Sequence, residues 1–152
     1  MENPPVKVVR LEPAITAAGK TFIGDYSASP KYAAEVQNLL TAASIPFIPN
    51  KVLGVYFDNP ETTPAEDQRC FQGFLLENES RVIDPPLSSL SLAGKYLYTK
   101  VSGDPGKIIF EGYNAIFSHI RERGVVLKSN AGYQVSTFEN NMVTVEIYME
   151  IL

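Results

Sequence analysis

The sequence has little of the residue types that most often build disulfides, metal sites and hydrolytic triads. Its 152 residues include one cysteine, Cys70, one histidine, His119, and no tryptophan. A single cysteine excludes an internal disulfide and a cysteine metal cluster. One histidine leaves little for a histidine zinc site or a Ser-His-Asp triad. We therefore expect no metal and no cofactor, and we interpret Cys70 and His119 as structural residues.

Long apolar runs and an excess of positive charge are also absent. No stretch approaches the roughly 20 apolar residues that a membrane-spanning helix needs. Residues 1–5 (Met-Glu-Asn-Pro-Pro) lack the basic-then-apolar pattern of a secretory signal. Thirteen basic against seventeen acidic residues give a net charge of −4, whereas nucleic-acid binding needs clustered lysines and arginines. These features predict a cytoplasmic protein with no membrane span and no direct nucleic-acid partner.

The sequence does contain a repeat with an offset of 75 residues. The tripeptide Ala-Gly-Lys occurs at 18–20 and again at 93–95, and the same offset aligns Ser29 with Asp104. Both aligned residues precede a proline, so each is a predicted helix N-cap with proline at the first helical position. Gly124 is a natural stop for the second helix. Apolar stripes at helical spacing follow: Tyr32, Val36, Leu39, Leu40 and Ala43, then Ile109, Tyr113, Ile116 and Ile120.

Strand-like segments flank both predicted helices. They cover 6–11, 21–26, 51–57 and 69–76 in the first half, and 95–101, 133–139 and 142–151 in the second. Each half, 6–77 and 93–152, has the order strand–helix–strand–strand, and the Ser- and Pro-rich residues 78–92 form a linker. We predict one domain over 1–152 with an α+β fold of duplicated βαββ units. Two antiparallel sheets would carry helices on one face, with a ligand cleft between the halves.

The last predicted strand alternates between an apolar and a polar face. The polar face, which holds Glu146 and Tyr148, is either a solvated sheet face or one wall of the cleft. In a cleft, a carboxylate beside a phenol would attract a cation, and aromatic faces would add cation–π attraction. The carboxylate could also perform acid–base chemistry.

Aromatic side chains supply the other candidate ligand contacts. The 75-residue offset aligns Phe71 with Glu146, which predicts one apolar wall and one acidic wall. Such a site suits an amphipathic ligand, cations among them. The predicted ligand-binding residues are Glu146, Tyr148, Tyr56, Phe71, Tyr98 and Tyr133.

The run Val-Tyr-Phe-Asp-Asn-Pro-Glu-Thr-Thr-Pro-Ala-Glu at 55–66, followed by Arg69 and Cys70, resembles the signature of the GyrI-like small-molecule-binding superfamily. That superfamily includes the effector-binding domains of multidrug-responsive MerR and AraC regulators and stand-alone gyrase-inhibitor proteins. The resemblance implies a duplicated βαββ fold with a ligand cleft, and it implies that Glu146 engages cationic ligands there. With no helix-turn-helix beside the domain, the chain resembles the stand-alone form.

Two departures from the family pattern bear on the ligand. Phe71 and Gln72 stand where an acidic residue is common after Arg-Cys, and Ser136 stands where a tyrosine is usual. The ligand preference of any one member therefore does not transfer to this chain.

Three functions stay open. We favour a small-molecule-binding protein that is not an enzyme. The first alternative, implied by relatives of this fold, is a hydrolase of electrophilic, cyclopropane-type toxins, with Glu146 as catalytic acid or base and Tyr148 or Tyr133 assisting. The second is a protein-interaction module, similar to gyrase inhibitors, whose protein partner is unknown.

Overall fold

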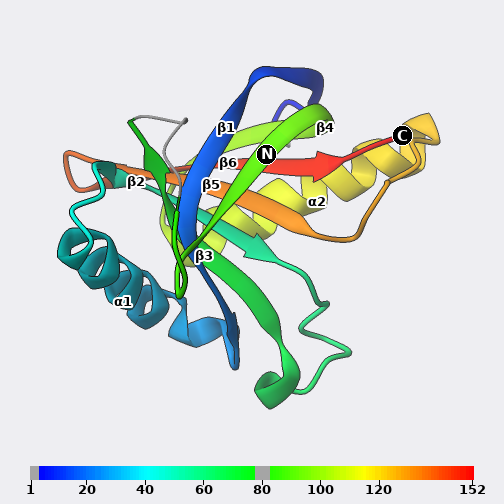
Figure 1. Ribbon diagram of the computed structural model, residues 1–152. Coiled ribbons are helices and arrows are strands. Elements are labelled where there is room, and N and C mark those ends of the chain that lie inside the picture. Colours follow the sequence, from blue (N-terminus) through cyan, green and yellow to red (C-terminus); the bar gives the residue numbers. More distant parts are fainter. Residues whose placement is uncertain (1–3, 78–82) are drawn as a thin grey trace.

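The computed structural model describes residues 4–77 and 83–152 and contains six antiparallel strands and two α-helices (Figure 1). The first half comprises β1 (Lys7–Ile23), α1 (Ser29–Ala42), β2 (Phe47–Tyr56) and β3 (Arg69–Leu76). The second half comprises β4 (Ser88–Gly103), α2 (Pro105–Arg123), β5 (Gly132–Glu139) and β6 (Met142–Glu150). Short 3-10 turns, η1 (Tyr26–Ala28) and η2 (Ala65–Asp67), precede α1 and β3. The predicted βαββ order therefore occurs twice.

The expectation of two separate sheets is wrong, because the strands close into one barrel in the order β1-β3-β2-β5-β6-β4. Closure depends on β1, which pairs with β3 over Ala17–Ile23 and with β4 on its other edge. The strands expected at 6–11 and 21–26 are thus one strand, with a register shift between Leu11 and Ile15. The close approach of β1 to β3 depends on glycine at position 19, since a Cβ there would collide with the Gln72 backbone of β3.

The linker expected at 78–92 is shorter than predicted. Residues 78–82 lie outside the described part of the chain, and 88–92 already belong to β4. The strand expected at 95–101 therefore begins at Ser88, and its first residues pair with Ala17–Gly19 of β1. That pairing is the one that closes the barrel.

Local signals identified the second helix better than the first. The Asp104 side chain accepts a hydrogen bond from the Gly106 N–H at 3.1 Å, and Gly124 ends α2 in the left-handed conformation with φ of 65°. Ser29 is not the N-cap of α1; it is the first helical residue, and its hydroxyl donates back to the Tyr26 carbonyl at 2.7 Å. The η1 turn explains the difference, because it brings the chain into a helical conformation before Ser29.

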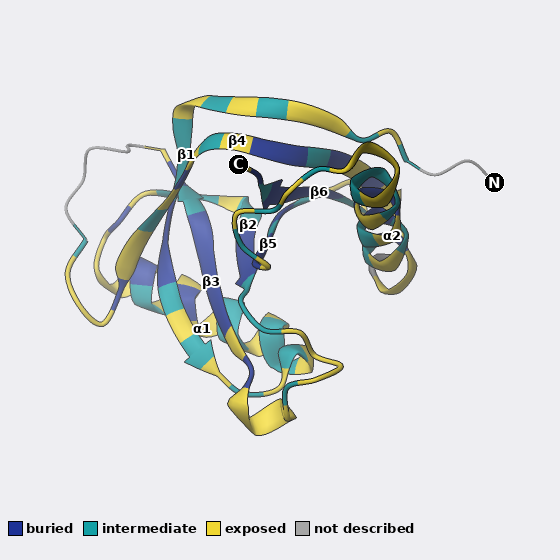
Figure 2. Cartoon of the chain, turned by 90° about the vertical axis from the view of Figure 1, so that its right-hand side faces the viewer, coloured by how far each residue is buried: buried dark blue, intermediate teal, exposed yellow. Residues whose placement is uncertain are grey.

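Three apolar clusters form among the residues that the structure describes. One occupies the barrel interior and takes residues from all six strands, Phe71 and Tyr148 among them. The other two lie on the outer face of the barrel, beneath α1 and beneath α2, and Figure 2 shows buried strand segments next to each of these helices. On β6 the alternation follows this division, since Val145 and Ile147 pack under α2 while Tyr148 points into the barrel. No helix among the described residues is long and apolar enough to span a membrane.

Candidate functional site

A cleft of about 1110 Å³ opens on the outer face of the barrel between α2 and the segment that follows β2. Its floor comes from the paired strands β2 and β5, so both halves contribute to it. Its lining includes six aromatic residues: Tyr26, Tyr56, Phe57, Phe110, Tyr113 and Phe117. A concave site with apolar walls and a few placed polar groups is the usual form of a small-molecule site.

The α2 wall presents aromatic rings to solvent. Phe110 is 69% exposed and Phe117 is 40% exposed, and the Phe117 ring stacks against that of Tyr113 at 6.4 Å. The helix is held close to the barrel at Gly112, where a Cβ would collide with Ile147 of β6. Core packing therefore accounts for the inner face of α2, but it does not account for the exposed rings.

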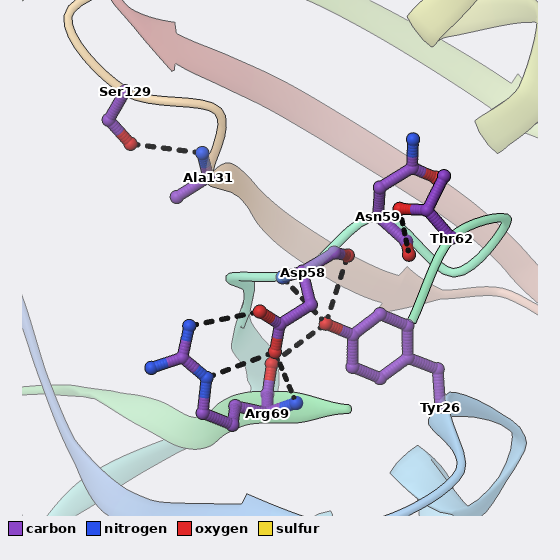
Figure 3. Close-up of polar contacts among 7 residues, drawn as sticks. All are labelled: Tyr26, Asp58, Asn59, Thr62, Arg69, Ser129 and Ala131. Atoms are coloured by element: carbon purple, nitrogen blue, oxygen red, sulfur yellow. Dashed lines mark hydrogen bonds and ion pairs between the residues drawn. The ribbon is translucent and has the colours of Figure 1, made fainter. Parts of the chain in front are cut away.

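The opposite wall is the loop after β2, which is held by Asp58 and Arg69 (Figure 3). The Arg69 guanidinium donates to both Asp58 carboxylate oxygens at 3.0 and 2.9 Å, and the Arg69 N–H donates to the same carboxylate at 2.8 Å. These bonds lower the pKa of Asp58 from its ordinary value. The Tyr26 hydroxyl donates to the Arg69 carbonyl at 2.8 Å and accepts from the Asp58 N–H at 3.0 Å. The Tyr-Phe-Asp-Asn-Pro run thus shapes the cleft wall.

Two tyrosine hydroxyls lie at the cleft floor, each bonded to a buried glutamine. Gln134 Nε2 donates to Tyr113 Oη at 2.8 Å, and Gln72 Nε2 donates to Tyr56 Oη at 3.2 Å. Both glutamines are less than 10% exposed. Burial raises the pKa of Tyr113 to about 12, so this phenol stays protonated at neutral pH.

The predicted acid, Glu146, faces the barrel interior instead of the cleft. Its carboxylate accepts hydrogen bonds from Tyr98 at 2.7 Å and from Tyr148 at 3.4 Å. Desolvation, followed by the nearby carboxylate, raises the pKa of both phenols. Tyr96 and Tyr133 pack beside this group, with their ring centroids 5.9 Å apart.

The predicted ligand-binding residues therefore lie on two different faces of the sheet. Glu146, Tyr148, Tyr98, Tyr133 and Phe71 belong to the barrel interior. Tyr56 lines the cleft on the outer face, where its ring contacts that of Tyr26 at 4.9 Å.

Sequence reasoning missed the α2 side of the cleft. The apolar stripe at helical spacing predicts Tyr113 in the core, and it does not include Phe110 or Phe117. The available signal was their spacing, since aromatic residues at 110, 113 and 117 widen one face of the helix beyond the Ile109–Ile116 stripe that packs on the barrel. Gln134 gave no local signal, because its role depends on a contact with a different element.

Metal ions require a set of ligating side chains that lie close together. Within residues 4–77 and 83–152, no group of three or more His, Cys, Asp or Glu side chains could hold a metal ion.

A concave, aromatic-lined cleft of this kind is typical of small-molecule-binding sites. Residues 5–152 match the family model described as the GyrI-like small molecule binding domain. The chain therefore belongs to the GyrI-like family, as its motif at 55–66 predicts. No curated protein matches the sequence.

Solved structures share this fold at low sequence identity. The C-terminal domain of EcmrR covers 98% of both chains with a TM-score of 0.74 at 11% identity. In the EcmrR–DNA complex the TM-score is 0.75 at 10% identity, over 99% of this chain and 58% of the EcmrR chain. The present chain thus spans little more than half of that relative.

Two further structures carry chemical information about the relatives themselves. SAV2435 bound to tetraphenylphosphonium is similar with a TM-score of 0.63 at 12% identity, over 97% of this chain and 94% of SAV2435. A hydrolase from Listeria innocua is similar with a TM-score of 0.65 at 6% identity, over 99% of this chain and 93% of the hydrolase. At these identities the similarity shows the fold alone.

Proposed function

We propose that this protein binds an amphipathic, aromatic small molecule in the outer cleft, and that it acts by capturing the ligand. The observation that carries the proposal is the pair of exposed rings, Phe110 and Phe117, facing a cleft of about 1110 Å³. A large apolar ring in water is costly, and stacking on a ligand ring removes it from water. The βαββ order that occurs in both halves also supports an origin of the two halves by duplication.

The charge of the ligand is a separate part of the proposal. Of the acids near the cleft, Asp58 is paired with Arg69, whereas Glu61 lines the cleft and is exposed. A cation would gain attraction from the aromatic faces and from Glu61, and bound tetraphenylphosphonium in SAV2435 supports testing this class. Glu146 would take part only if the ligand entered the barrel.

Titration with tetraphenylphosphonium and neutral triphenylphosphine oxide tests both parts. In Phe110→Ala/Phe117→Ala we expect the Kd for each compound to rise about tenfold, since two stacking contacts are lost. Phe138→Ala is the matched control, because Phe138 is 49% exposed but lies at the far end of β5. An unchanged Kd in the double variant would refute binding in the cleft.

The two acids are compared in the same assay. Glu61→Gln should weaken binding of the cation and leave the phosphine oxide unaffected. Equal loss of cation binding in Glu146→Gln would instead place the ligand in the barrel. If neither variant changes the preference for the cation, selection by a carboxylate is wrong.

Hydrolysis is a second candidate because Glu146 and two tyrosine hydroxyls do come together. In that case Glu146 would take a proton from water as the water oxygen bonds to a carbon of an electrophilic, cyclopropane-type substrate and the ring C–C bond breaks. The ring carbon that keeps the electron pair would take the proton of the Tyr148 hydroxyl, and Glu146 would return its proton to Tyr148. Turnover that is lost in both Glu146→Gln and Tyr148→Phe would support this reaction. If wild-type turnover is no faster than that of Glu146→Gln or of Tyr148→Phe, this reaction is excluded.

A further inference from the structure

A row of two glutamines and a glycine crosses three strands beneath the cleft. Gly54 on β2 is the cross-strand partner of Gln72 on β3 and of Gln134 on β5. Directly opposed residues of antiparallel strands share one face of a sheet. The two amides therefore flank a position without a side chain on the face that bears the cleft.

Tyrosine side chains fill the space that a side chain at Gly54 or Gly132 would take. A Cβ at Gly54 would lie 2.9 Å from the Tyr56 hydroxyl, and a Cβ at Gly132 would collide with the Tyr113 hydroxyl. Gly132 is in turn the cross-strand partner of Tyr56. Two phenols from different elements are thus laid side by side on the sheet surface, each within reach of one amide.

The two hydroxyls differ in the acceptors to which they donate their hydrogens. Tyr56 accepts from Gln72 and has Ser29 Oγ as an acceptor at 3.4 Å. Tyr113 accepts from Gln134 at 2.8 Å, and over the described ranges 4–77 and 83–152 its hydroxyl donates to no acceptor. An amide that occupies a lone pair of the phenol leaves the hydroxyl hydrogen for another partner. Tyr113 and Gln134 both line the cleft, so that partner would come from the cleft.

We propose that the Tyr113 hydroxyl, oriented by Gln134, is a hydrogen-bond donor for an acceptor oxygen on an aromatic ligand, such as a ketone, an aryl ether or a phosphine oxide. This inference rests on the proposed function of the cleft and names the ligand class. Phe110 and Phe117 stand one helical turn on either side of Tyr113 on α2. The ligand rings pack on these side chains while the oxygen reaches the hydroxyl between them. A donor that is already positioned loses less entropy on binding.

Benzophenone and diphenylmethane form a matched pair of probes, since both have two phenyl rings and only the first has a carbonyl oxygen. Each would be titrated against the full chain by NMR chemical-shift perturbation. We expect wild type to bind benzophenone about three- to tenfold more tightly than diphenylmethane, the value of one hydrogen bond in a binding constant.

The variant Tyr113→Phe/Gln134→Leu removes both partners together. Replacing only the tyrosine would free the Gln134 amide to donate in its place. In the double variant we expect the preference for benzophenone to disappear, so that the two probes bind with about the same Kd. Tyr32→Phe is the control, because Tyr32 is a half-buried tyrosine of α1 that stacks on Phe22 away from the cleft lining.

The outcomes separate the two proposals. If wild type binds both probes equally, the donor subsite is wrong while ligand binding in the cleft stands. A preference that persists in Tyr113→Phe/Gln134→Leu also refutes the subsite. If wild type binds neither probe, the proposed function fails, and the subsite fails with it.

Discussion

Adding a single methyl group at Gly132 should disrupt the floor of the cleft without touching its walls. Gly132 begins β5 and is buried, and a Cβ there would collide with the Tyr113 hydroxyl. The Tyr113 ring cannot easily yield, because this side chain of α2 packs against the apolar cluster between α2, β4 and β6. We therefore expect Gly132→Ala to displace the hydroxyl and to break its bond with Gln134.

The cost follows from the burial of Gln134, which is 8% exposed. A buried donor left without a partner costs about 1–3 kcal/mol. For a chain of 152 residues, each kcal/mol shifts the melting temperature by about 2–4 °C, so Tm should fall by about 2–12 °C. Thermal unfolding followed by circular dichroism measures this shift.

Two comparisons make the result decisive. Gly106→Ala is the control, because a Cβ there meets only the Asp104 carboxylate at an ordinary 3.7 Å. Gly132→Ala/Tyr113→Phe should lose less stability than the sum of the single variants, since the colliding hydroxyl is gone. A Gly132→Ala protein with the Tm of wild type would refute the close approach of Tyr113 to β5.

Two further predictions concern pH. The pKa values of Tyr96 and Tyr113 are raised to about 12, chiefly by burial. Their contribution to stability is therefore present below the ordinary tyrosine pKa of about 10 and is lost between about pH 10 and 12. Urea unfolding should give a lower free energy of unfolding at pH 11 than at pH 9, with a smaller drop in Tyr113→Phe, and an equal free energy at both pH values would contradict the prediction. The pKa of Asp58 is lowered by Arg69, so its contribution to stability is present above about pH 4 and is lost as the pH falls further. Asp58→Asn should therefore be less stable than wild type at pH 7, and the difference should shrink as the pH falls below about 4. Asp67→Asn is the exposed control, and a difference that stays constant with pH would count against the ion pair.

Features that depend on local sequence were predictable here. Asp104 and Gly124 mark the ends of α2, and the alternation of valine, isoleucine and methionine places β6 on its correct face. Each depends on residues within one or two helical turns or along one strand. The family signature at 55–66 is local in the same sense, and it identified the fold.

Closure of the barrel and the position of the cleft were not predictable in this way. The pairing of β1 with β4 joins segments some 90 residues apart, such as Val8 with Leu97. Nothing near Val8 in the sequence indicates that partner. The same holds for Tyr113 and Gln134, which meet only because α2 lies over β5. Grouping Tyr56 with Glu146 failed to anticipate that these residues face opposite sides of one curved sheet.

The motif that identifies the family also limits how this cleft can select a ligand. Asp58 uses both carboxylate oxygens on the Arg69 side chain and one of them on the Arg69 N–H as well. A carboxylate paired in this way presents little net charge to a ligand, and the exposed position of Arg69 allows solvent to screen the pair further. The remaining polar groups of the floor are uncharged phenols and amides. Under the proposed function, ring shape and uncharged hydrogen bonds would therefore be the stronger determinants in the cleft, and charge selection would come from Glu61 at its edge.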